Sequence, residues 1–193
     1  MYNYLLILLL ALANQGIAQD EFFPVDESGK YIFADIVALK GMTKDQLFDN
    51  GEKFMKKIKV LHSKSKFLKS DKENYQIKNR GSFYVYRLGS LKKGIAGAVE
   101  YDITLDFKDD KYRYQITNFR FNEYKKNRYG KYEPIKGKYT PLEMEASSLN
   151  MKEWNNQKEV VYQKSQELIQ NLNGEMIYAE EKKDKKQKYK KEW

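Results

Sequence analysis

The sequence predicts an α+β domain in which an antiparallel sheet of about five strands carries two helices on one face. Apolar and polar residues alternate strictly from Val99 to Phe107, which is typical of a strand with one buried and one solvent-facing side. Apolar residues recur at helical spacing in 43–61 and again in about 149–172. The elements follow in the order β-α-β-β-β-β-α, and the natural packing sets both apolar helix faces against one apolar sheet face.

The first strand and the first helix have clear local signals. Residues 31–39 are rich in β-formers and predict a strand, which Gly41 ends. Thr43 begins the helix, and Gln46 three residues later completes a capping box. Gly51 lies on the apolar face of this helix, although glycine costs about 1 kcal/mol relative to alanine there. We therefore expect the helix to approach the sheet closely at Gly51.

The middle of the chain alternates between strand and turn signals. Four strands are predicted, at 66–69, 75–87, 99–107 and 112–121. Gly81 predicts a bulge or bend inside the second of them, and the stretch 94–97 predicts a connecting turn. Asp109-Asp110 predicts a tight turn. The alternation slips phase near Thr117-Asn118, which predicts a β-bulge.

The last third of the chain is polar and basic before it becomes helical. Residues 123–148 are rich in Lys and Tyr and predict a long loop or a distorted hairpin extension. A second helix is predicted from about Leu149 to Leu172, and Asn173-Gly174 is typical of a helix end. The tail, 175–193, has seven Lys and one Asp within 182–191 and predicts a mobile extension. One domain is thus expected over 19–174.

The first 18 residues predict a cleavable signal peptide. An apolar run from Leu5 to Ala13 precedes small residues at Gly16 and Ala18, which suit cleavage before Gln19. The alternative is a membrane anchor, but a spanning helix needs about 20 apolar residues and this run is about half as long. No Cys follows the run, which excludes a lipid anchor on cysteine. We expect an exported protein, periplasmic or extracellular.

The composition excludes several catalytic chemistries. The chain has no Cys, so it has no thiol nucleophile, thiol redox centre or thiolate metal site. His62 is the single histidine and is interpreted as a surface residue at a helix end. The carboxylate pairs Asp26-Glu27 and Asp109-Asp110 fall in predicted turns, which explain them. The sequence therefore predicts no catalytic residue, no metal and no cofactor.

The basic charge predicts a binding surface. Of the formal net charge of +9, residues 111–140 carry +7, from nine basic and two acidic residues. Cations attract phosphates and sulfates, and aromatic rings provide stacking surfaces. The alternative interpretation is a solvated hairpin with no partner. The candidate binding residues are Lys125, Lys126, Arg128, Tyr129, Lys131 and Tyr132.

Two functions of different classes follow. The favoured one is a non-catalytic envelope or secreted binding module, whose partner is an anionic envelope component or a protein; nucleic acid is the least favoured partner. The alternative is a hydrolase that acts on an acidic polymer with a pair of carboxylates. Asp102 and Asp106, on the polar side of their strand, are interpreted as solvent-facing residues.

Three segments resemble a known family. They are 23–31 (FPVDESGKY), 41–47 (GMTKDQL) and 101–114 (YDITLDFKDDKYRY). The chain is similar to a bacterial domain of unknown function with a TBP-like fold, found in exported proteins of Bacteroides-type bacteria. This resemblance implies the fold, an envelope or extracellular location, and a core position for the Phe22-Phe23-Pro24 segment. It implies no activity and no catalytic residues, because function is not inherited from a fold.

Overall fold

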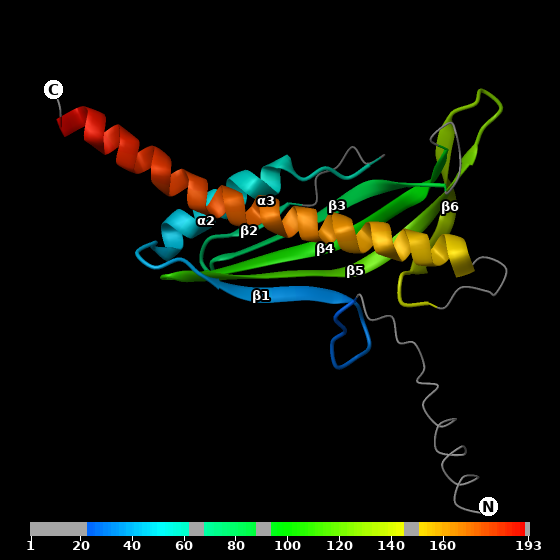
Figure 1. Ribbon diagram of the computed structural model, residues 1–193, viewed down its shortest axis with the longest axis horizontal. Helices are drawn as coiled ribbons and strands as arrows, with labels where there is room; N and C mark the ends of the chain where they lie inside the picture. Colours follow the sequence, from blue (N-terminus) through cyan, green and yellow to red (C-terminus); the bar gives the residue numbers. More distant parts are fainter. Residues whose placement is uncertain (1–22, 62–67, 88–93, 145–150, 192–193) are drawn as a thin grey trace, which may run out of the picture.

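Both helices of the protein lie on one face of a six-stranded antiparallel sheet (Figure 1). The computed structural model describes residues 23–61, 68–87, 94–144 and 151–191. The elements are β1 (Ile32–Ala38), α2 (Lys44–Lys57), β2 (Lys69–Asp71), β3 (Gln76–Tyr86), β4 (Ile95–Lys108), β5 (Lys111–Lys126), β6 (Tyr132–Pro141) and α3 (Met151–Lys191). The predicted α+β class, the antiparallel sheet and the packing of both helices on one sheet face are confirmed. The predicted signal peptide and His62 lie outside the described residues.

Strand β5 organises the sheet because three strands pair with it. The order is β1-β5-β4-β3-β2, and β6 pairs with β5 off this path. One edge of β5 pairs with β4, while the other pairs with β1 over residues 111–117 and then with β6 over 120–126. Strand β6 therefore continues the sheet beyond the end of β1.

The phase slip predicted near Thr117-Asn118 is a β-bulge between β4 and β5. Two residue pairs bracket it: Glu100 with Arg120, and Asp102 with Thr117. Two residues of β5, Asn118 and Phe119, thus lie opposite Tyr101 alone, and Asn118 has a φ of 55°. Asn adopts this left-handed conformation more readily than most residues do. The extra residue turns Phe119 back toward the core, where it is buried.

Helix α2 begins where the capping box predicts. The Thr43 hydroxyl accepts a hydrogen bond from the Gln46 N–H at 3.3 Å, and the Gln46 side chain accepts one from the Thr43 N–H at 3.0 Å. The close approach expected at Gly51 is also confirmed, because a Cβ there would overlap the Phe107 ring of β4. This contact accounts for a glycine inside the helix despite its low helix propensity.

Helix α3 crosses the sheet and extends past it (Figure 1). The end predicted at Asn173-Gly174 is wrong, since the helix continues to Lys191. Leu172 and Met176, on either side of the glycine, are both fully buried, and the Asn50 amide of α2 donates to the Met176 carbonyl at 3.3 Å. Burial of this turn offsets the glycine penalty of about 1 kcal/mol. The tail predicted to be a mobile extension is thus helical as far as Lys191.

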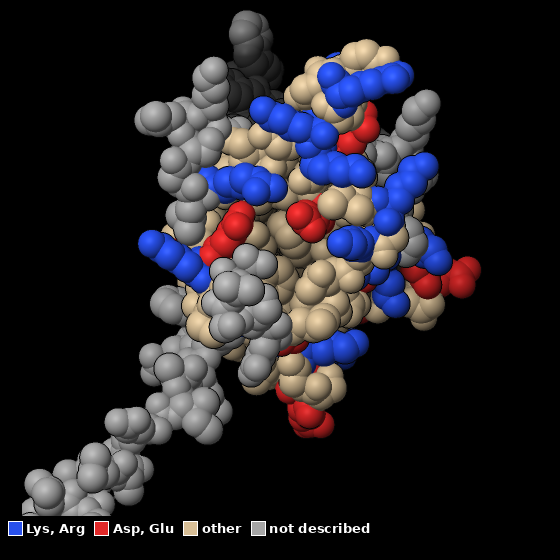
Figure 2. All heavy atoms as spheres, turned by 90° about the vertical axis from the view of Figure 1, so that its right-hand side faces the viewer, with Lys and Arg blue, Asp and Glu red and all other residues tan. Residues whose placement is uncertain are grey.

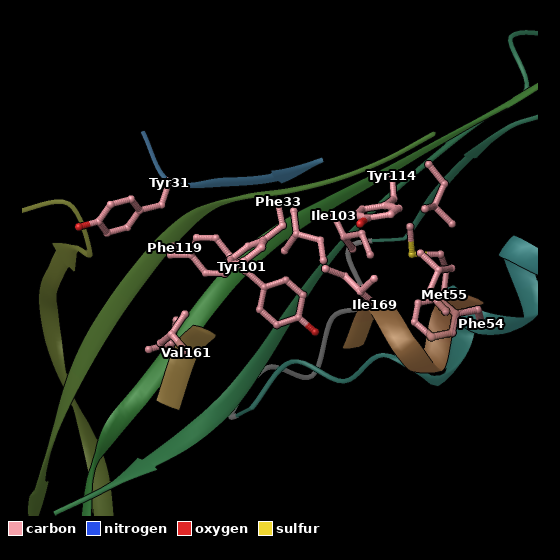
Figure 3. Packing of buried hydrophobic residues seen from close by; sticks show 14 of the residues in the cluster. Tyr31, Phe33, Phe54, Met55, Tyr101, Ile103, Tyr114, Phe119, Val161 and Ile169 are labelled. Atoms are coloured by element: carbon pink, nitrogen blue, oxygen red, sulfur yellow. The ribbon is translucent and has the colours of Figure 1, made fainter. Parts of the chain in front are cut away.

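Aromatic and aliphatic side chains fill the space between the sheet and the helices (Figure 3). On β4, Tyr101, Ile103 and Leu105 are buried in one cluster with residues of both helices, which confirms the face that the alternation predicts. Phe23 is buried too, and its ring stacks on Tyr31 with 4.4 Å between centroids. Of the segment 22–24, Phe23 therefore belongs to the core as predicted, whereas Pro24 is exposed and Phe22 lies outside the described residues.

Of the two alternatives predicted for 123–148, the described residues show the distorted hairpin extension and not the long loop: β5 extends to Lys126, β6 occupies 132–141, and their pairing shifts register between Asn122 and Tyr124. The sheet therefore has six strands, and the order gains a strand. Two other predictions about the strands are wrong. Residues 95–97, predicted to form a turn, belong to β4. Gly81 pairs in register with Tyr101 and is not a bulge; a Cβ there would overlap the Tyr101 hydroxyl. Its role is to make room for that side chain.

Candidate binding surface

The predicted binding residues lie together on a two-stranded projection at one end of the sheet (Figure 1). We call residues 125–140 the basic hairpin; they comprise the end of β5, the connecting turn and most of β6. Lys125 and Lys126 end β5, Arg128, Tyr129 and Lys131 form the turn, and Tyr132 begins β6. The structure therefore brings the whole predicted set onto one element.

Asn127 holds the turn of the basic hairpin in shape. Its side-chain oxygen accepts hydrogen bonds from the N–H groups of Tyr129 at 2.9 Å and Lys131 at 3.0 Å. Its side-chain amide donates to Glu133 at 2.7 Å, and its own N–H donates to the Lys131 carbonyl at 2.8 Å. Gly130 supplies the left-handed conformation that the turn needs, with a φ of 76°. The basic side chains thus extend from an ordered turn.

The basic hairpin concentrates positive charge that the rest of the described structure does not neutralise. Its sixteen residues contain six basic residues and one acidic residue, a net charge of +5. Among the described residues, none of these six cations forms an ion pair with a carboxylate. Figure 2 shows the end of the molecule where the hairpin lies, and basic side chains predominate there. Mutual repulsion of these cations favours an anionic partner.

Cations project from both faces of the basic hairpin. In the backbone register of the two strands, Lys125 lies opposite Glu133 and Lys126 lies opposite Tyr132. Successive side chains of a strand point to opposite faces, so Lys125 and Lys126 lie on opposite sides. Further along β6, residues 135–138 lie opposite Glu123 alone, because the register shifts there. Lys136 and Lys138 lie in this stretch, and both are exposed. These two lysines were not among the predicted residues, although the same run of charge contains them.

The turn of the basic hairpin also carries an exposed aromatic ring. Tyr129 is 71% exposed, and the Arg128 guanidinium lies 4.8 Å from the centroid of its ring. On β6, the Tyr132 ring lies 5.3 Å from the Lys126 ammonium. Cations over aromatic faces are attracted by the ring quadrupole, by about 0.5–1 kcal/mol at exposed sites. The surface therefore combines positive charge with amphipathic rings.

The base of the basic hairpin is fixed to the body of the domain. The Tyr124 side chain is 2% exposed, and its ring packs edge to face against Tyr84 with 5.9 Å between centroids. Burial raises the pKa of Tyr124 to about 12, with Tyr84 and Glu100 adding to the shift. On the other strand, Leu142 follows β6 and is fully buried. The hairpin is consequently held in one orientation relative to the sheet.

The sheet face opposite the helices is polar, and its charges are paired. The ion pairs are Arg80–Asp102 at 2.9 Å, Arg113–Asp106 at 2.8 Å and Arg120–Glu100 at 3.7 Å. Asp102 and Asp106 lie on the polar side of β4, as predicted, and both are only half-exposed and engaged with arginine. This face is therefore close to electrically balanced, in contrast to the basic hairpin.

Three of the four acids in the two turn pairs, Asp26, Asp109 and Asp110, have structural partners. The Asp109 carboxylate accepts from the Lys44 N–H at 2.8 Å, and the Asp110 carboxylate accepts from the Gly41 N–H at 2.7 Å. The Asp26 carboxylate accepts from the hydroxyl and N–H of Ser28 and from the N–H of Lys30, and these bonds lower the pKa of Asp26. These contacts give Asp26, Asp109 and Asp110 structural roles in their turns.

A cavity of about 160 Å³ lies between α3 and β3. Its lining includes Ser82, Phe83 and Tyr101 from the sheet and Lys164, Ser165 and Glu167 from the helix. Glu167 is the one carboxylate that lines it, and it pairs with Lys164 at 2.5 Å. A hydrolase of the kind considered above needs two carboxylates across a cleft. This cavity gives that alternative no support.

Metal ligands and membrane-spanning helices are not found in the part of the chain that the structure describes. No group of three or more His, Cys, Asp or Glu side chains is placed there to hold an ion. No helix within the described ranges is both long and apolar enough to cross a bilayer.

Comparison with known proteins confirms the resemblance drawn from the sequence. Residues 33–122 match the family described as a domain of unknown function (DUF4468) with TBP-like fold. The matched range includes all of β1 except Ile32, then α2, β2, β3, β4 and most of β5, and it ends before the basic hairpin. The match therefore covers strands β1 to β5 of the sheet and helix α2, and it does not cover β6 or α3. A search of the curated proteins finds no match to this chain.

Two solved structures share the fold. A TBP-like protein from Parabacteroides distasonis is 15% identical to this chain, with a TM-score of 0.59, over 81% of this chain and 97% of that one. A DUF4468 family protein from Bacteroides ovatus is 16% identical, with a TM-score of 0.55, over 80% of this chain and 92% of that one. At these identities the likeness establishes the fold alone.

Proposed function

We propose that the protein is an exported, non-catalytic binding module that attaches to an anionic component of the cell envelope through its basic hairpin. The observation that carries the proposal is the group of six cations on the sixteen residues of the basic hairpin. None of these six forms an ion pair with a carboxylate of the described residues. The export half of the proposal is supported by the signal-peptide pattern of residues 1–18.

Physical considerations favour a role for this charge beyond solubility. An exposed strand edge needs only a few lysines to discourage pairing with another chain. A cluster of six adds repulsion that packing does not require and that an anionic partner would relieve. The hairpin is ordered before binding by Asn127 at the turn and Tyr124 at the base, so binding orders few additional residues.

The test is retention on agarose that carries dextran sulfate, with neutral dextran agarose as the reference. The hairpin variant replaces Lys125, Lys126, Arg128 and Lys131 by Gln. The matched control replaces Lys40, Lys53, Lys78 and Lys108 by Gln, four exposed lysines on other parts of the domain. Both variants have the same net charge, so a difference between them reports the location of the charge.

We expect the wild type and the control to be retained at low salt and released as the salt concentration rises, because salt screens exposed charges. The hairpin variant should pass through the column. Retention of the hairpin variant as strong as that of the control would contradict the proposal, and it would leave the basic hairpin as a solubilising surface.

A further inference from the structure

We infer that the anionic component is the surface of a lipid bilayer, on which the basic hairpin docks tip first. The inference rests on the proposed function, because it names the partner of the surface assigned there. It is argued from three features of the hairpin: the distribution of its cations, the position of its exposed tyrosine, and its projection from the sheet (Figure 1).

The distribution of the cations suits a planar partner better than a linear one. Lys125 and Lys126 lie on opposite faces of the two-stranded ribbon, while Arg128 and Lys131 lie in the turn. A single extended polymer that follows one face reaches the cations of that face and of the turn. A layer of headgroups that surrounds the tip reaches all of them at once. The two-faced arrangement therefore favours a membrane surface.

The aromatic side chains of the hairpin suit the same environment. Tyr129, in the turn, is 71% exposed, and Arg128 lies against its ring. Tyrosine has an apolar ring and a polar hydroxyl, and it is enriched at the level of lipid headgroups. Lysine and arginine have apolar stems that accompany a ring into this layer while their charges remain near the phosphates. An exposed tyrosine flanked by cations is thus a suitable contact with a bilayer interface.

The ordered fold places this tip where a surface can meet it. Strand β5 belongs to the central sheet, where it pairs with β4 and β1, and it extends directly into the hairpin, whose base is anchored by the buried Tyr124. The hairpin therefore presents its charge at one end of the domain, away from the C-terminal end of α3 (Figure 1). Attachment of this kind is peripheral, through headgroups, and depends on the anionic lipid content of the bilayer.

The experiment is co-sedimentation of the purified protein with vesicles of two compositions. One set contains phosphatidylcholine alone, and the other contains phosphatidylcholine mixed with phosphatidylglycerol. We expect sedimentation with the anionic vesicles at low salt, little with the neutral ones, and loss of binding by the four-residue hairpin variant but not by its matched control. Equal sedimentation with both vesicle types would overturn the inference.

Single substitutions separate a planar partner from a linear one. Lys125→Gln and Lys126→Gln should each weaken vesicle binding by a similar factor, about fivefold at low salt. Tyr129→Ser should weaken vesicle binding and leave retention on dextran sulfate unchanged. Tyr86→Ser, at another exposed tyrosine, is its control. A large loss for one lysine with none for the other would contradict docking by both faces.

The two proposals fail in different ways. Retention on dextran sulfate without any binding to anionic vesicles would overturn the lipid inference and leave the proposed function standing. Failure on both would overturn both. Unchanged circular dichroism and unfolding midpoints of the variants show that any loss of binding is not a loss of fold.

Discussion

The carboxylate of Asp109 accepts a hydrogen bond at 2.8 Å from the backbone N–H of Lys44, 65 residues earlier in the chain. The turn between β4 and β5 thereby caps the first residue of α2. Asp109→Ala should lower the free energy of unfolding by about 0.5–2 kcal/mol, as for a lost helix cap. Asp109→Asn keeps an acceptor and should cost less. Urea denaturation measures both, and an unchanged midpoint for Asp109→Ala would show that the contact contributes nothing to stability.

Two helical glycines should respond in opposite directions to alanine. Gly51→Ala places a methyl group against the Phe107 ring, so we expect a loss of about 1–3 kcal/mol from overpacking despite the better helix propensity. An added Cβ at Gly174 would meet no atom within 4 Å beyond its chain neighbours and the backbone of its own helix, so Gly174→Ala should stabilise the protein by up to about 1 kcal/mol. Thermal unfolding of both variants measures this contrast. Stabilisation by both would show that α2 is not tightly packed on β4.

Ile103 is a direct test of the buried face of β4. Its side chain is 1% exposed and belongs to the cluster between the sheet and the helices. Ile103→Ala should lower the free energy of unfolding by about 2–5 kcal/mol, because it removes buried methylene groups and leaves a cavity. Thr104→Ala, at the next residue on the polar face, is the control and should cost much less. The urea midpoints of the two variants give the comparison.

The buried tyrosines should make the fold sensitive to alkali. The pKa of Tyr124 is raised to about 12 by burial, and burial also raises the pKa of Tyr101 and of Tyr112. A tyrosine whose folded pKa exceeds its unfolded pKa stabilises the fold fully below about pH 10, and this contribution is lost as the pH rises toward the folded pKa. Tyr124→Phe should therefore lose less stability than wild type between about pH 10 and pH 12.

Urea unfolding at several alkaline pH values measures that difference. Tyrosinate absorbance provides a second observable, because the buried rings should ionise later than the exposed ones or only as the protein unfolds. Equal loss of stability in Tyr124→Phe and wild type would show that Tyr124 titrates with the same pKa in both states.

Export predicts a defined N-terminus. If residues 1–18 are removed, intact-mass analysis of the protein from its native host should give a chain that begins at Gln19. The small residues Gly16 and Ala18 specify that position, so Ala18→Tyr should block or shift the cleavage. A mass that includes residues 1–18 would contradict the signal-peptide interpretation.

Local sequence patterns determined a large part of the fold. The capping box of Thr43 and Gln46, the alternation from Val99 to Phe107 and the slip near Thr117-Asn118 each depend on neighbouring residues, and the structure confirms each one. The close approach of α2 to the sheet at Gly51 was also predicted correctly, because a glycine on an apolar helix face indicates close packing wherever the partner lies. The candidate binding residues could be found as a group because their charge is contiguous in the sequence.

Only the tertiary structure decided which charges are neutralised by ion pairs, that β6 forms as a strand, and how far α3 extends. Strand β6 lacks regular alternation because most of its residues are exposed, so it is defined by pairing with the long β5 and not by a buried face. Helix α3 passes through Gly174 because Met176 is buried nearby, with its carbonyl bonded to Asn50. Arginines on neighbouring strands neutralise Asp102 and Asp106, while none of the described carboxylates pairs with the cations of the basic hairpin. These outcomes depend on contacts between residues far apart in the chain, and a local sequence pattern cannot predict such contacts.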